Sequence, residues 1–501
     1  MVLCRLRATI GPEVLSGSGF LGAARGLDAF PISEYIQEST GQMANNDNRE
    51  ASDAVKVAVP AWALFVLDEL EAAGFEAWFV GGFVRDALLG RAAYDVDVAT
   101  SAAWEQVRDV FSSQGVAVIE TGAKHGTVTV RSAGHNVEVT TYRVDGAYAD
   151  GRHPDSVSRA HSIEEDLARR DFTMNAVAYH PRKGLLDPFG GIGDMRRCVI
   201  RAVGDADARL QEDALRVLRA VRFASQLGFA VEPETEDALF RRANGIAALS
   251  GERVSHEMDG ILCGTSVHDA IMRYARIIGI AIPELLELEG LDQRNPYHVY
   301  DALEHTAWAV QHTRPDPLVR WAAFLHDFGK PSCCTVDENG RGRFYGHPAC
   351  SVELARGVLK RMRKSARFSA DVLTLVEWHD ADIAPTPKSV KRMLARLDGR
   401  ADVLRALCEL KRGDARAQSE RARGKLENAS AVERTLDEVL AANEAFTVRD
   451  LEMNGEDVLA LGVPRGPEVG RALQAALDAV IEGLVPNERE ALRSFVRRKN
   501  F

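Results

Sequence analysis

Strand and helix signals are segregated along this chain of 501 residues, and no other feature constrains its fold as strongly. Up to about residue 205, short apolar or alternating runs that are typical of strands are interspersed with amphipathic helical runs. Beyond that point strand signals nearly vanish, and helical periodicity continues to the C-terminus. The pattern predicts an α+β head followed by all-α domains.

The head begins with a helix followed by a strand and a second helix. An apolar stripe over residues 63–73 predicts the first helix. Ala77–Val80 is typical of a short buried strand, and Gly81 and Gly82 interrupt it. We expect a helix to restart over residues 84–89.

Three further strand signals follow in the head. Residues 94–98 predict a second strand. Residues 127–130 and 137–140 alternate with period two on either side of a turn at 132–134. This alternation predicts a β-hairpin.

Charge and cysteine usage exclude some classes of protein. A formal net charge of −11 excludes a protein that coats nucleic acid through bulk positive charge, although it leaves room for a local basic groove. No run approaches about 18 uninterrupted apolar residues, so no membrane span is expected. The seven cysteines show no paired spacing, and the adjacent Cys333 and Cys334 lack the spacing of a zinc knuckle. We therefore expect structural cysteines and a reducing, cytoplasmic location.

A glycine pair between a strand and a helix predicts a phosphate-binding turn. At Gly81–Gly82, backbone N–H groups can converge on phosphate oxygens, and the helix N-terminus adds partial positive charge. Arg85 lies one turn into that helix. An ordinary turn is the alternative, because a glycine pair alone is a weak signal.

Two carboxylates follow close behind this turn. Asp95 and Asp97 are at i and i+2 of a predicted strand, so both side chains project from one face. Such a pair next to a phosphate site suits two Mg²⁺ ions, whereas two solvated acids on an edge strand would be the alternative. Glu138 on the hairpin is a candidate third ligand, or else a solvent-facing acid.

Four motifs in a fixed order then indicate a family. They resemble those of the class II tRNA nucleotidyltransferase/poly(A) polymerase family, which belongs to the polymerase-β-like nucleotidyltransferase superfamily. The resemblance covers about residues 76–260 and implies a polymerase-β-like head followed by a helical neck. The motifs are Gly81–Asp86 with Leu89–Arg91 and Asp95–Asp97, then Asp166–Ala176, then Asp187–Gly191, and finally Glu212–Phe223.

The second motif contains the run Arg169-Arg170-Asp171. By itself this run could be a charged helix face, because it follows an acidic run. The family resemblance implies that these three residues bind the ribose and base of the incoming nucleotide.

The fourth motif contains a pair that can read a base. Asp213 and Arg216 are at i and i+3 of a segment with strong helical periodicity, so we expect them to share one helix face, with a simple salt bridge as the alternative. A carboxylate accepts and a guanidinium donates, which matches the amine donor and ring-nitrogen acceptor of cytosine and adenine. Uracil and guanine present the reverse pattern. In the family this motif is held to act as a protein template, and Arg219 and Arg222 are expected to contact the triphosphate or the base plane.

A second group of metal-ligand residue types lies in the helical region. An adjacent His-Asp pair ends an apolar run, and several other histidines are close in sequence. The pattern resembles the HD domain of metal-dependent phosphohydrolases. The resemblance implies a divalent metal of unknown identity, with catalysis or a purely structural role both open. Its implied ligands are His305, His326, Asp327 and Asp414 for one metal and His347 and His379 for a second, with Asp380 a less certain neighbour, His298 structural, and Gly329-Lys330 near a phosphate.

The chain is accordingly expected to comprise several domains, since its length suggests roughly three at about 100–200 residues each. The N-terminal extension has little to bury and is expected to be disordered, and Met43 is a candidate for the true start. The expected segments are this extension (1–52), a nucleotidyltransferase head (53–200), a helical neck for nucleotide selection and RNA binding (201–290), an HD-like metal-binding domain (291–425), and a helical tail (426–501).

The tail contains the glycine- and proline-rich turn Leu461–Gly470. Such a turn can hold an RNA phosphate on backbone amides, but an ordinary helix–helix connection explains it equally well. A tRNA contact here is one interpretation.

The resemblance as a whole implies an enzyme that adds CCA to tRNA 3′ ends from CTP and ATP. The RNA 3′-hydroxyl would attack the α-phosphate with the help of Mg²⁺, releasing pyrophosphate. The motifs are shared with poly(A) polymerases and with enzymes that add only CC or only A, although the HD-like region favours CCA addition. An HD phosphohydrolase with a regulatory nucleotide-binding head and a non-catalytic RNA-binding protein are alternatives of other classes, but Asp95 and Asp97 argue against both. No DNA or membrane partner is expected, and the oligomeric state is open.

Overall fold

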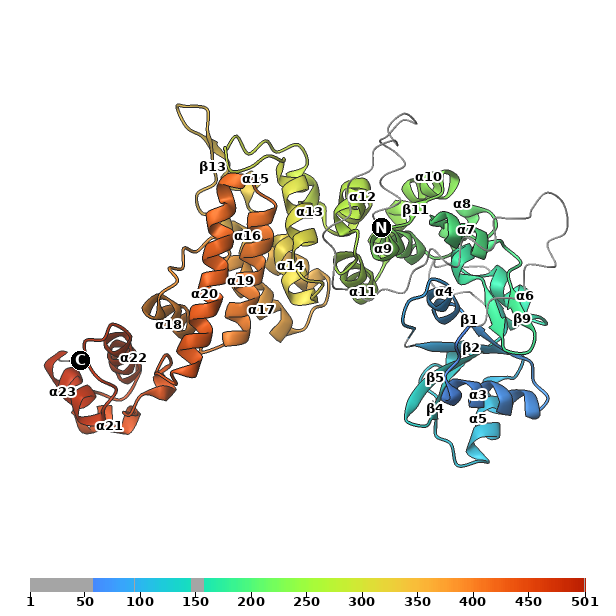
Figure 1. Cartoon of the computed structure of the whole chain (residues 1–501), viewed down its shortest axis with the longest axis horizontal. Coiled ribbons are helices and arrows are strands. Elements are labelled where there is room, and N and C mark those ends of the chain that lie inside the picture. The colour runs from blue at the N-terminus through green and yellow to red at the C-terminus, as the bar shows by residue number, and fades with distance from the viewer. Residues whose placement is uncertain (1–56, 94, 146–156, 500) are drawn as a thin grey trace, which may run out of the picture. The chain divides into compact units, whose positions relative to one another are not determined.

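The computed structural model describes residues 57–93, 95–145, 157–499 and 501, all of which belong to one compact unit (Figure 1). The predicted N-terminal extension and Tyr94 lie outside these residues. Within the described part, no helix is both long enough and apolar enough to cross a membrane.

A seven-stranded sheet forms the centre of the head, with the strand order β3-β4-β5-β2-β1-β8-β9. Neighbouring strands are antiparallel except β2 and β5, which are parallel. The predicted α+β head is confirmed. The strands are β1 (Ala77–Val80), β2 (Val96–Thr100), β3 (Val118–Ile119), β4 (Thr127–Ser132), β5 (His135–Thr141), β8 (Ala178–His180) and β9 (Gly184–Leu186).

The central strand β1 is buried on both faces, which explains its continuous apolar sequence. Phe79 belongs to the main hydrophobic core, whereas Trp78 and Val80 belong to a smaller core on the other face. Helix α3 contributes a buried stripe to the main core, as its periodicity predicts. The head helices are α3 (Ala61–Ala72), α4 (Gly82–Leu88), α5 (Trp104–Ser112), α6 (Ile163–Ala168) and α7 (Gly191–Arg197), and a small sheet pairs β6 (Arg143–Asp145) with β7 (Val157–Arg159).

The predicted hairpin is formed by β4 and β5. Its turn residues Ala133 and Gly134 have φ values of 48° and 84°, and Ser132 pairs with His135 across them. A two-residue turn with both φ values positive matches the twist of an antiparallel pair, so the register of β5 is fixed locally. This register positions Glu138.

The neck is helical and packs closely against itself. A Cβ on Gly264 would lie 2.0 Å from Ser225 Oγ on α9, so the chain can pass this helix only without a side chain. A two-residue parallel pair, β10 with β11, is too short to have been predicted from periodicity. The elements are β10 (Val199–Ile200), α8 (Ala206–Glu212), α9 (Leu215–Leu227), β11 (Ala230–Val231), α10 (Pro233–Arg242), α11 (Gly251–Leu262) and α12 (Val267–Ala281).

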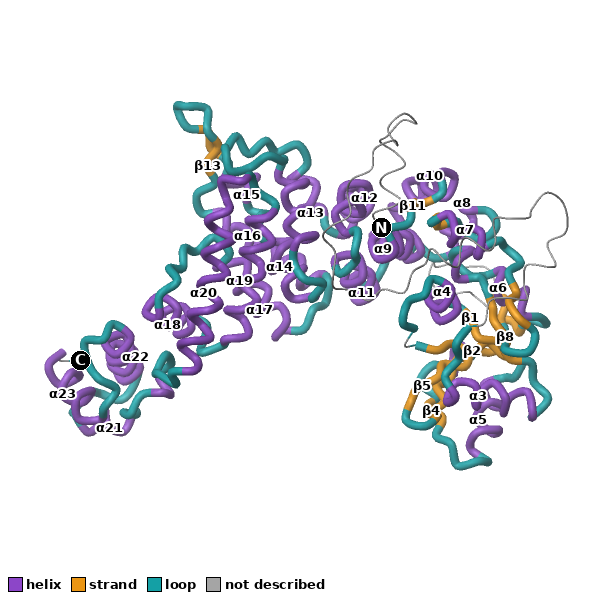
Figure 2. The backbone as a smooth tube through the Cα atoms, in the orientation of Figure 1, coloured by secondary structure: helices purple, strands orange, loops and turns teal. Residues whose placement is uncertain are grey.

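The rest of the described chain is also helical apart from one short hairpin, which confirms the prediction for this region (Figure 2). The last helices, α21 (Gly455–Ala460), α22 (Pro467–Ile481) and α23 (Arg489–Lys499), share a hydrophobic core of their own. The preceding elements are α13 (Ala302–His312), α14 (Pro317–Leu325), α15 (Lys330–Cys333), β12 (Thr335–Val336), β13 (Gly342–Arg343), α16 (His347–Arg361), α17 (Ala366–Trp378), α18 (Pro387–Arg396), α19 (Ala401–Arg416) and α20 (Arg423–Ala441).

Candidate active site and candidate metal centre

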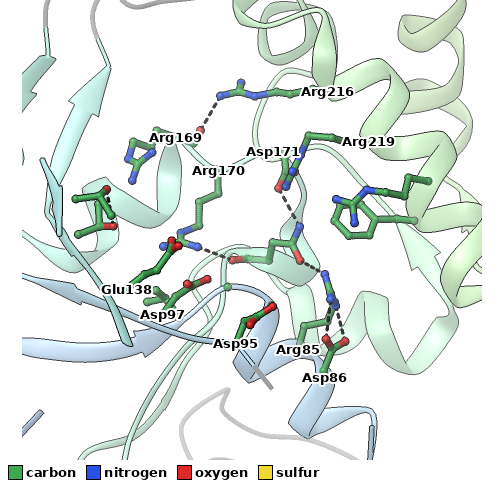
Figure 3. A pocket seen from close by; sticks show the side chains of 18 of the residues that line it. Arg85, Asp86, Asp95, Asp97, Glu138, Arg169, Arg170, Asp171, Arg216 and Arg219 are labelled. Atoms are coloured by element: carbon green, nitrogen blue, oxygen red, sulfur yellow. Dashed lines mark hydrogen bonds and ion pairs between the residues drawn. The ribbon is translucent and has the colours of Figure 1, made fainter. Parts of the chain in front are cut away.

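A cavity of about 830 Å³ lies where the sheet of the head meets α9 of the neck (Figure 3). Its volume is within the range of pockets that bind small molecules. All the residues that the sequence predicts for the head and nucleotide site line this cavity. They are Gly81, Gly82, Arg85, Asp95, Asp97, Glu138, Arg169, Arg170, Asp171, Asp213, Arg216, Arg219 and Arg222.

The glycine turn closes one side of the cavity. Gly81 has a φ of +68°, and a Cβ there would lie 3.0 Å from Arg170 Nη1 and 3.3 Å from Asp97 Oδ2. Both the backbone conformation and the space therefore require glycine. The close approach leaves the backbone accessible to a phosphate group beside Arg85.

Three carboxylates converge at the adjoining edge of the sheet. Asp97 on β2 is opposite Glu138 in the parallel register, and Asp95 lies just before β2 (Figure 3). Burial, together with the charge of Glu138, raises the pKa of Asp97 to about 6, although Arg170 opposes the shift. Carboxylates that are costly to ionise next to one another are stabilised by a divalent cation, so the donor set fits magnesium.

The arginines of the second motif are held by a buried acid. Asp166 is fully buried and pairs with Arg169 at 2.7 Å and with Arg170 at 3.2 Å. Burial would raise the pKa of Asp166, but the two guanidinium groups hold it below its usual range. The run is thus a fixed ion-pair cluster on the cavity wall rather than a solvated helix face.

The third residue of this run pairs with the neck. Asp171 accepts hydrogen bonds from Arg219 Nε at 2.7 Å and from Asn175 Nδ2 at 3.0 Å. Burial opposes ionisation, yet Arg219 and Asn175 hold the pKa of Asp171 well below its usual range. Asp171 is therefore an ionised acceptor inside the cavity.

The structure corrects one prediction about the fourth motif. Asp213 does not share a helix with Arg216: it ends α8 in an extended conformation, and its carboxylate accepts from Leu215 N at the start of α9. Asp213 pairs with Arg253 at 2.7 Å, whereas Arg216 pairs with Glu212. Side-chain capping of α9 breaks the helical periodicity that suggested a shared face. Both side chains nevertheless line the cavity.

Sequence reasoning missed two residues that organise this wall. Asn175 hydrogen-bonds to both Arg85 and Asp171, and the ring of Phe223 lies within about 5.5 Å of the guanidinium groups of three arginines. Both residues line the cavity, and both lie inside the quoted motifs, so motif membership was the available signal.

The HD-like region brings its six predicted ligands together in two groups. One consists of His305, His326 and Asp414, and the other of Asp327, His347 and His379. His305, His347 and Asp414 lie on α13, α16 and α19. His326 and Asp327 directly follow α14, and His379 directly follows α17.

Asp327 lies between the two groups. Its Oδ2 is 3.1 Å from His326 Nε2, and its Oδ1 is 3.4 Å from His347 Nε2. His347 Nε2 and His379 Nε2 are 3.1 Å apart. The prediction grouped Asp327 with His305, His326 and Asp414, whereas in the structure its two carboxylate oxygens face a histidine of each group.

Backbone carbonyls orient all four imidazole rings. The Nδ1 atom of each ring faces a backbone carbonyl, so each Nε2 atom points into the cluster, toward a carboxylate or, for His347 and His379, toward the other ring. In the described part of the chain, the buried Nε2 atoms of His305 and His326 make no hydrogen bond of good geometry, although they lie 3.1 Å from Asp414 Oδ1 and Asp327 Oδ2, respectively. A cation satisfies such facing lone pairs, so the residues fit a divalent metal. The acceptors are Ala417 O for His305, Ala323 O for His326, Phe344 O for His347 and Val376 O for His379.

Burial opposes protonation of His305 and His347, but Asp327 raises the pKa of both rings, so in the metal-free cluster these imidazoles compete with a cation for the carboxylate. Burial lowers the pKa of His379 to about 3, which keeps that ring neutral. Burial opposes ionisation of Asp327, but His326 and Lys330 hold its pKa well below the usual range. Lys330 Nζ lies 2.6 Å from Asp327, so this lysine is engaged by the cluster and not directed freely at a phosphate.

The two peripheral predictions lie outside both groups. His298 stacks edge-on against His305, and burial lowers its pKa to about 3. Asp380 is exposed.

Comparisons with known proteins identify the family. Residues 77–201 match the model of the poly A polymerase head domain, residues 228–286 that of a probable RNA and SrmB-binding site of polymerase A, and residues 351–496 that of a putative tRNA nucleotidyltransferase domain 2. None of these matching models names an HD domain. That part of the predicted resemblance rests on the His/Asp cluster alone.

Relatives match over nearly their whole length. The chain is 34% identical over 460 residues to the CCA-adding enzyme of Geobacillus stearothermophilus, covering 87% of this chain and 96% of that protein. It is 36% identical over 442 residues to the CCA-adding enzyme of Geobacillus kaustophilus, with the same coverage. The crystal structure of the Bacillus stearothermophilus CCA-adding enzyme in complex with CTP has a TM-score of 0.66 at 32% identity, covering 88% of this chain and 97% of that one. The chain therefore belongs to the class II CCA-adding enzyme family: it is a tRNA nucleotidyltransferase that adds CCA to tRNA 3′ ends.

Proposed function

We propose that the cavity between the sheet and α9 binds CTP and ATP in turn and transfers their nucleotides to the tRNA 3′-hydroxyl. The observation that carries this proposal is the convergence of a glycine turn, three carboxylates and the side chains of Asp213 and Arg216 on one cavity. The similar Bacillus enzyme was crystallised with CTP, which supports the choice of donor. The acceptor follows from the family.

The chain's own residues bind and orient the nucleotide. Gly81, Gly82 and Arg85 bind the triphosphate and retain the leaving pyrophosphate. Asp95 and Asp97, joined by Glu138, would hold magnesium, which when bound supplies charge neutralisation and a more acidic 3′-hydroxyl. Positioning contributes most of the rate, so no covalent nucleophile is needed.

The remaining polar residues select the nucleoside. Arg169, Arg170 and Asp171 bind the ribose and base. Asp213 accepts from the exocyclic amine and Arg216 donates to the adjacent ring nitrogen, which favours C and A over U and G. Arg216 already donates to Glu212 and to the backbone carbonyls of Arg209 and Arg169, and Asp213 accepts from Arg253 and Leu215 N. Both retain hydrogen-bonding capacity, because each carboxylate oxygen has two lone pairs and a guanidinium has five N–H groups.

Substitution of Asp213 tests the selection step. Asp213→Ala removes the acceptor while Arg216 still donates, and the loss of a charge-assisted hydrogen bond, roughly 1.5–3 kcal/mol, should reduce C-over-U preference about tenfold or more. The assay is competition among mixed nucleoside triphosphates on tRNA lacking its 3′ end.

The matched control for this test is Asp207→Ala. Asp207 lies on α8, close before Asp213 in sequence, and is likewise paired with arginine, but it does not line the cavity. Unchanged preference in the Asp213 variant would assign Asp213 to ion pairing alone.

We also propose a second activity, metal-dependent phosphoester hydrolysis, at the His/Asp cluster. The observation that favours it is the set of buried imidazole lone pairs facing Asp327. A divalent metal held there would supply an activated water, which suits phosphomonoesters or 2′,3′-cyclic phosphates. Such a reaction would clear blocked 3′ ends before CCA addition.

Substitution of Asp327 tests whether this activity is separate. Asp327→Ala should abolish metal-dependent hydrolysis of model phosphoesters and spare CCA addition, because the His/Asp cluster and the head cavity have no residue in common. Exposed Asp380→Ala serves as the control for surface charge. Equal hydrolysis by wild type and Asp327→Ala would refute the catalytic role, and lost CCA addition in a folded variant would refute separability.

Three further predictions remain proposals. We propose domain boundaries at residues 52, 200, 290 and 425. The separate hydrophobic core of the last three helices begins at Leu451 and supports a distinct tail there, whereas α20 packs into the main core. The turn between α21 and α22 is a candidate tRNA contact. A cytoplasmic location rests on the cysteine pattern.

A further inference from the structure

A continuous chain of hydrogen bonds connects the phosphate side of the cavity to its nucleoside side. It alternates acids and guanidinium groups and passes through one neutral residue, Asn175 (Figure 3). Asn175 is 5% exposed and lies at the end of the short 3₁₀ helix Thr173–Asn175. The links are Asp86 to Arg85 at 2.9 Å, Arg85 Nη1 to Asn175 Oδ1 at 2.9 Å, Asn175 Nδ2 to Asp171 Oδ1 at 3.0 Å, and Arg219 Nε to Asp171 Oδ2 at 2.7 Å.

The oxygen and the nitrogen of the Asn175 amide have partners with opposite hydrogen-bonding requirements. Arg85 has only donors, so it requires an acceptor, whereas ionised Asp171 has only acceptors and requires a donor. An amide supplies both within one planar group. Neither a carboxylate nor an apolar side chain of the same size can do so.

Two arginines of this hydrogen-bond network, together with Arg222, also surround the ring of Phe223. The guanidinium carbons of Arg85, Arg219 and Arg222 lie 5.0, 5.5 and 4.4 Å from the centre of the Phe223 ring. Three positive charges around one ring repel each other, and this repulsion is offset when each guanidinium group is paired with its own acid. The acids are Asp86 for Arg85, Asp171 for Arg219 and Glu257 for Arg222.

We propose that Asn175 is a positioning residue that holds the phosphate-binding Arg85 in register with the nucleoside-binding Asp171–Arg219 pair. The triphosphate and the nucleoside are then bound at the separation that places the α-phosphate correctly. This inference rests on the proposed nucleotide site, because it assigns Arg85 and Asp171 to opposite ends of the same ligand.

Two nearly isosteric substitutions separate the two demands. Asn175→Leu removes both hydrogen bonds, and kcat/KM for CTP and for ATP should fall about tenfold or more, with the KM for tRNA unchanged. Asn175→Asp keeps the acceptor for Arg85 but places a second carboxylate against Asp171. At about pH 8 it should be at least as damaging as Asn175→Leu.

Protonation should rescue only the aspartate variant. A protonated carboxyl at position 175 donates to Asp171 and accepts from Arg85, which restores the native pattern. The charged groups facing it are Arg85 from α4, Arg219 from α9, Asp171, and Arg170, whose Nη1 contacts the Asn175 backbone carbonyl at 3.5 Å. The activity ratio of Asn175→Asp to wild type should therefore rise several-fold between about pH 8 and about pH 5.5, while the ratio for Asn175→Leu stays flat.

The control is Asn428→Asp, the same change at a half-buried asparagine on α20 that does not line the cavity. It should match wild type at every pH. A pH-independent Asn175→Asp ratio, or wild-type kcat/KM in Asn175→Leu, would overturn the inference.

A parallel assay of Asp97→Ala distinguishes failure of the positioning role from failure of the proposed nucleotide site. If Asp97→Ala is inactive while both Asn175 variants behave as wild type, only the positioning role fails. If Asp97→Ala is also active, the proposed site itself fails. Should Asn175→Leu not fold, the pH ratio of the isosteric Asn175→Asp decides alone.

Discussion

Asp97→Asn should make the metal-free protein more stable and at the same time inactive. The carboxylate of Asp97 is ionised at neutral pH in a buried place beside Glu138 and Asp95, and this raises its pKa from 3.8 to about 6. An amide of the same shape removes the charge and keeps the packing. Stability and activity are therefore expected to change in opposite directions.

The size of the stability change follows from the rise in the pKa of Asp97. A rise of about 2 pKa units corresponds to about 3 kcal/mol at about 1.4 kcal/mol per unit. The folded state binds the proton more tightly than the unfolded state, so the unfavourable contribution is absent below about pH 4, grows between about pH 4 and 6, and is complete above about pH 6. Asp97→Asn should thus gain up to about 3 kcal/mol at about pH 7.5 and almost nothing at about pH 4.

The assay is denaturant unfolding of wild type and variant in chelator at these two pH values. Added magnesium should stabilise the wild type and leave the variant unchanged, because only the wild type retains the ligand. Nucleotide addition by the variant should fall about 1,000-fold or more, on the order of 4 kcal/mol. A variant that is less stable than wild type at neutral pH, or equally stabilised at both pH values, would refute the electrostatic reasoning.

Further predictions concern packing, selection and metal dependence. Gly191→Ala places a Cβ 2.0 Å from Thr173 O and should lower the free energy of unfolding by about 3 kcal/mol, whereas Gly470→Ala, in open space on α22, should raise it by about 0.5–1 kcal/mol, both measured by denaturant unfolding. Arg253→Met removes the partner that holds the Asp213 carboxylate at 2.7 Å. The preference for C over U in a competition assay should therefore fall about tenfold, while the affinity for tRNA is retained. Chelation of divalent cations should abolish nucleotide addition reversibly, and addition that persists in excess chelator would contradict a metal-dependent reaction.

The head was predictable where local chemistry decides the structure. Ala77–Val80, the glycine break after it and the hairpin turn are set by residues that are neighbours in sequence, and the structure places all three as expected. Strand periodicity placed Asp97 on β2 but was wrong in extending the strand to Asp95, which lies just before it, although both residues line the cavity. Glu138 needed the sheet order, because its position opposite Asp97 depends on which strand pairs with β2.

The pair proposed to select the nucleotide, Asp213 and Arg216, shows where periodicity misleads. The run around Asp213 has apolar residues at helical spacing on both sides, yet the Asp213 carboxylate accepts from Leu215 N and separates two helices. Nothing in the local pattern indicates that Arg253, 40 positions away, pairs with Asp213. Competition between a side-chain cap and helix continuation is decided by such long-range partners.

The His/Asp cluster illustrates the limit of motif reasoning. Its members were predicted from residue types and from the resemblance to HD domains, but their division into two groups with Asp327 between them depends on how the surrounding helices pack. Likewise, Asn175 lay within a quoted motif, and its double role became visible only when α4 and α9 were placed on either side of it. The sequence showed which residues are present, but it could not show which of their atoms come into contact.

The most direct test of the central claim is to sequence what the purified protein adds to tRNA. The substrate is tRNA that lacks its 3′ CCA, incubated with magnesium and with all four nucleoside triphosphates together. The account predicts C, then C, then A, followed by termination, with U and G absent and no product from Asp97→Ala. A tail of repeated A, an addition that stops at CC, addition of A alone, or incorporation of U or G would contradict it.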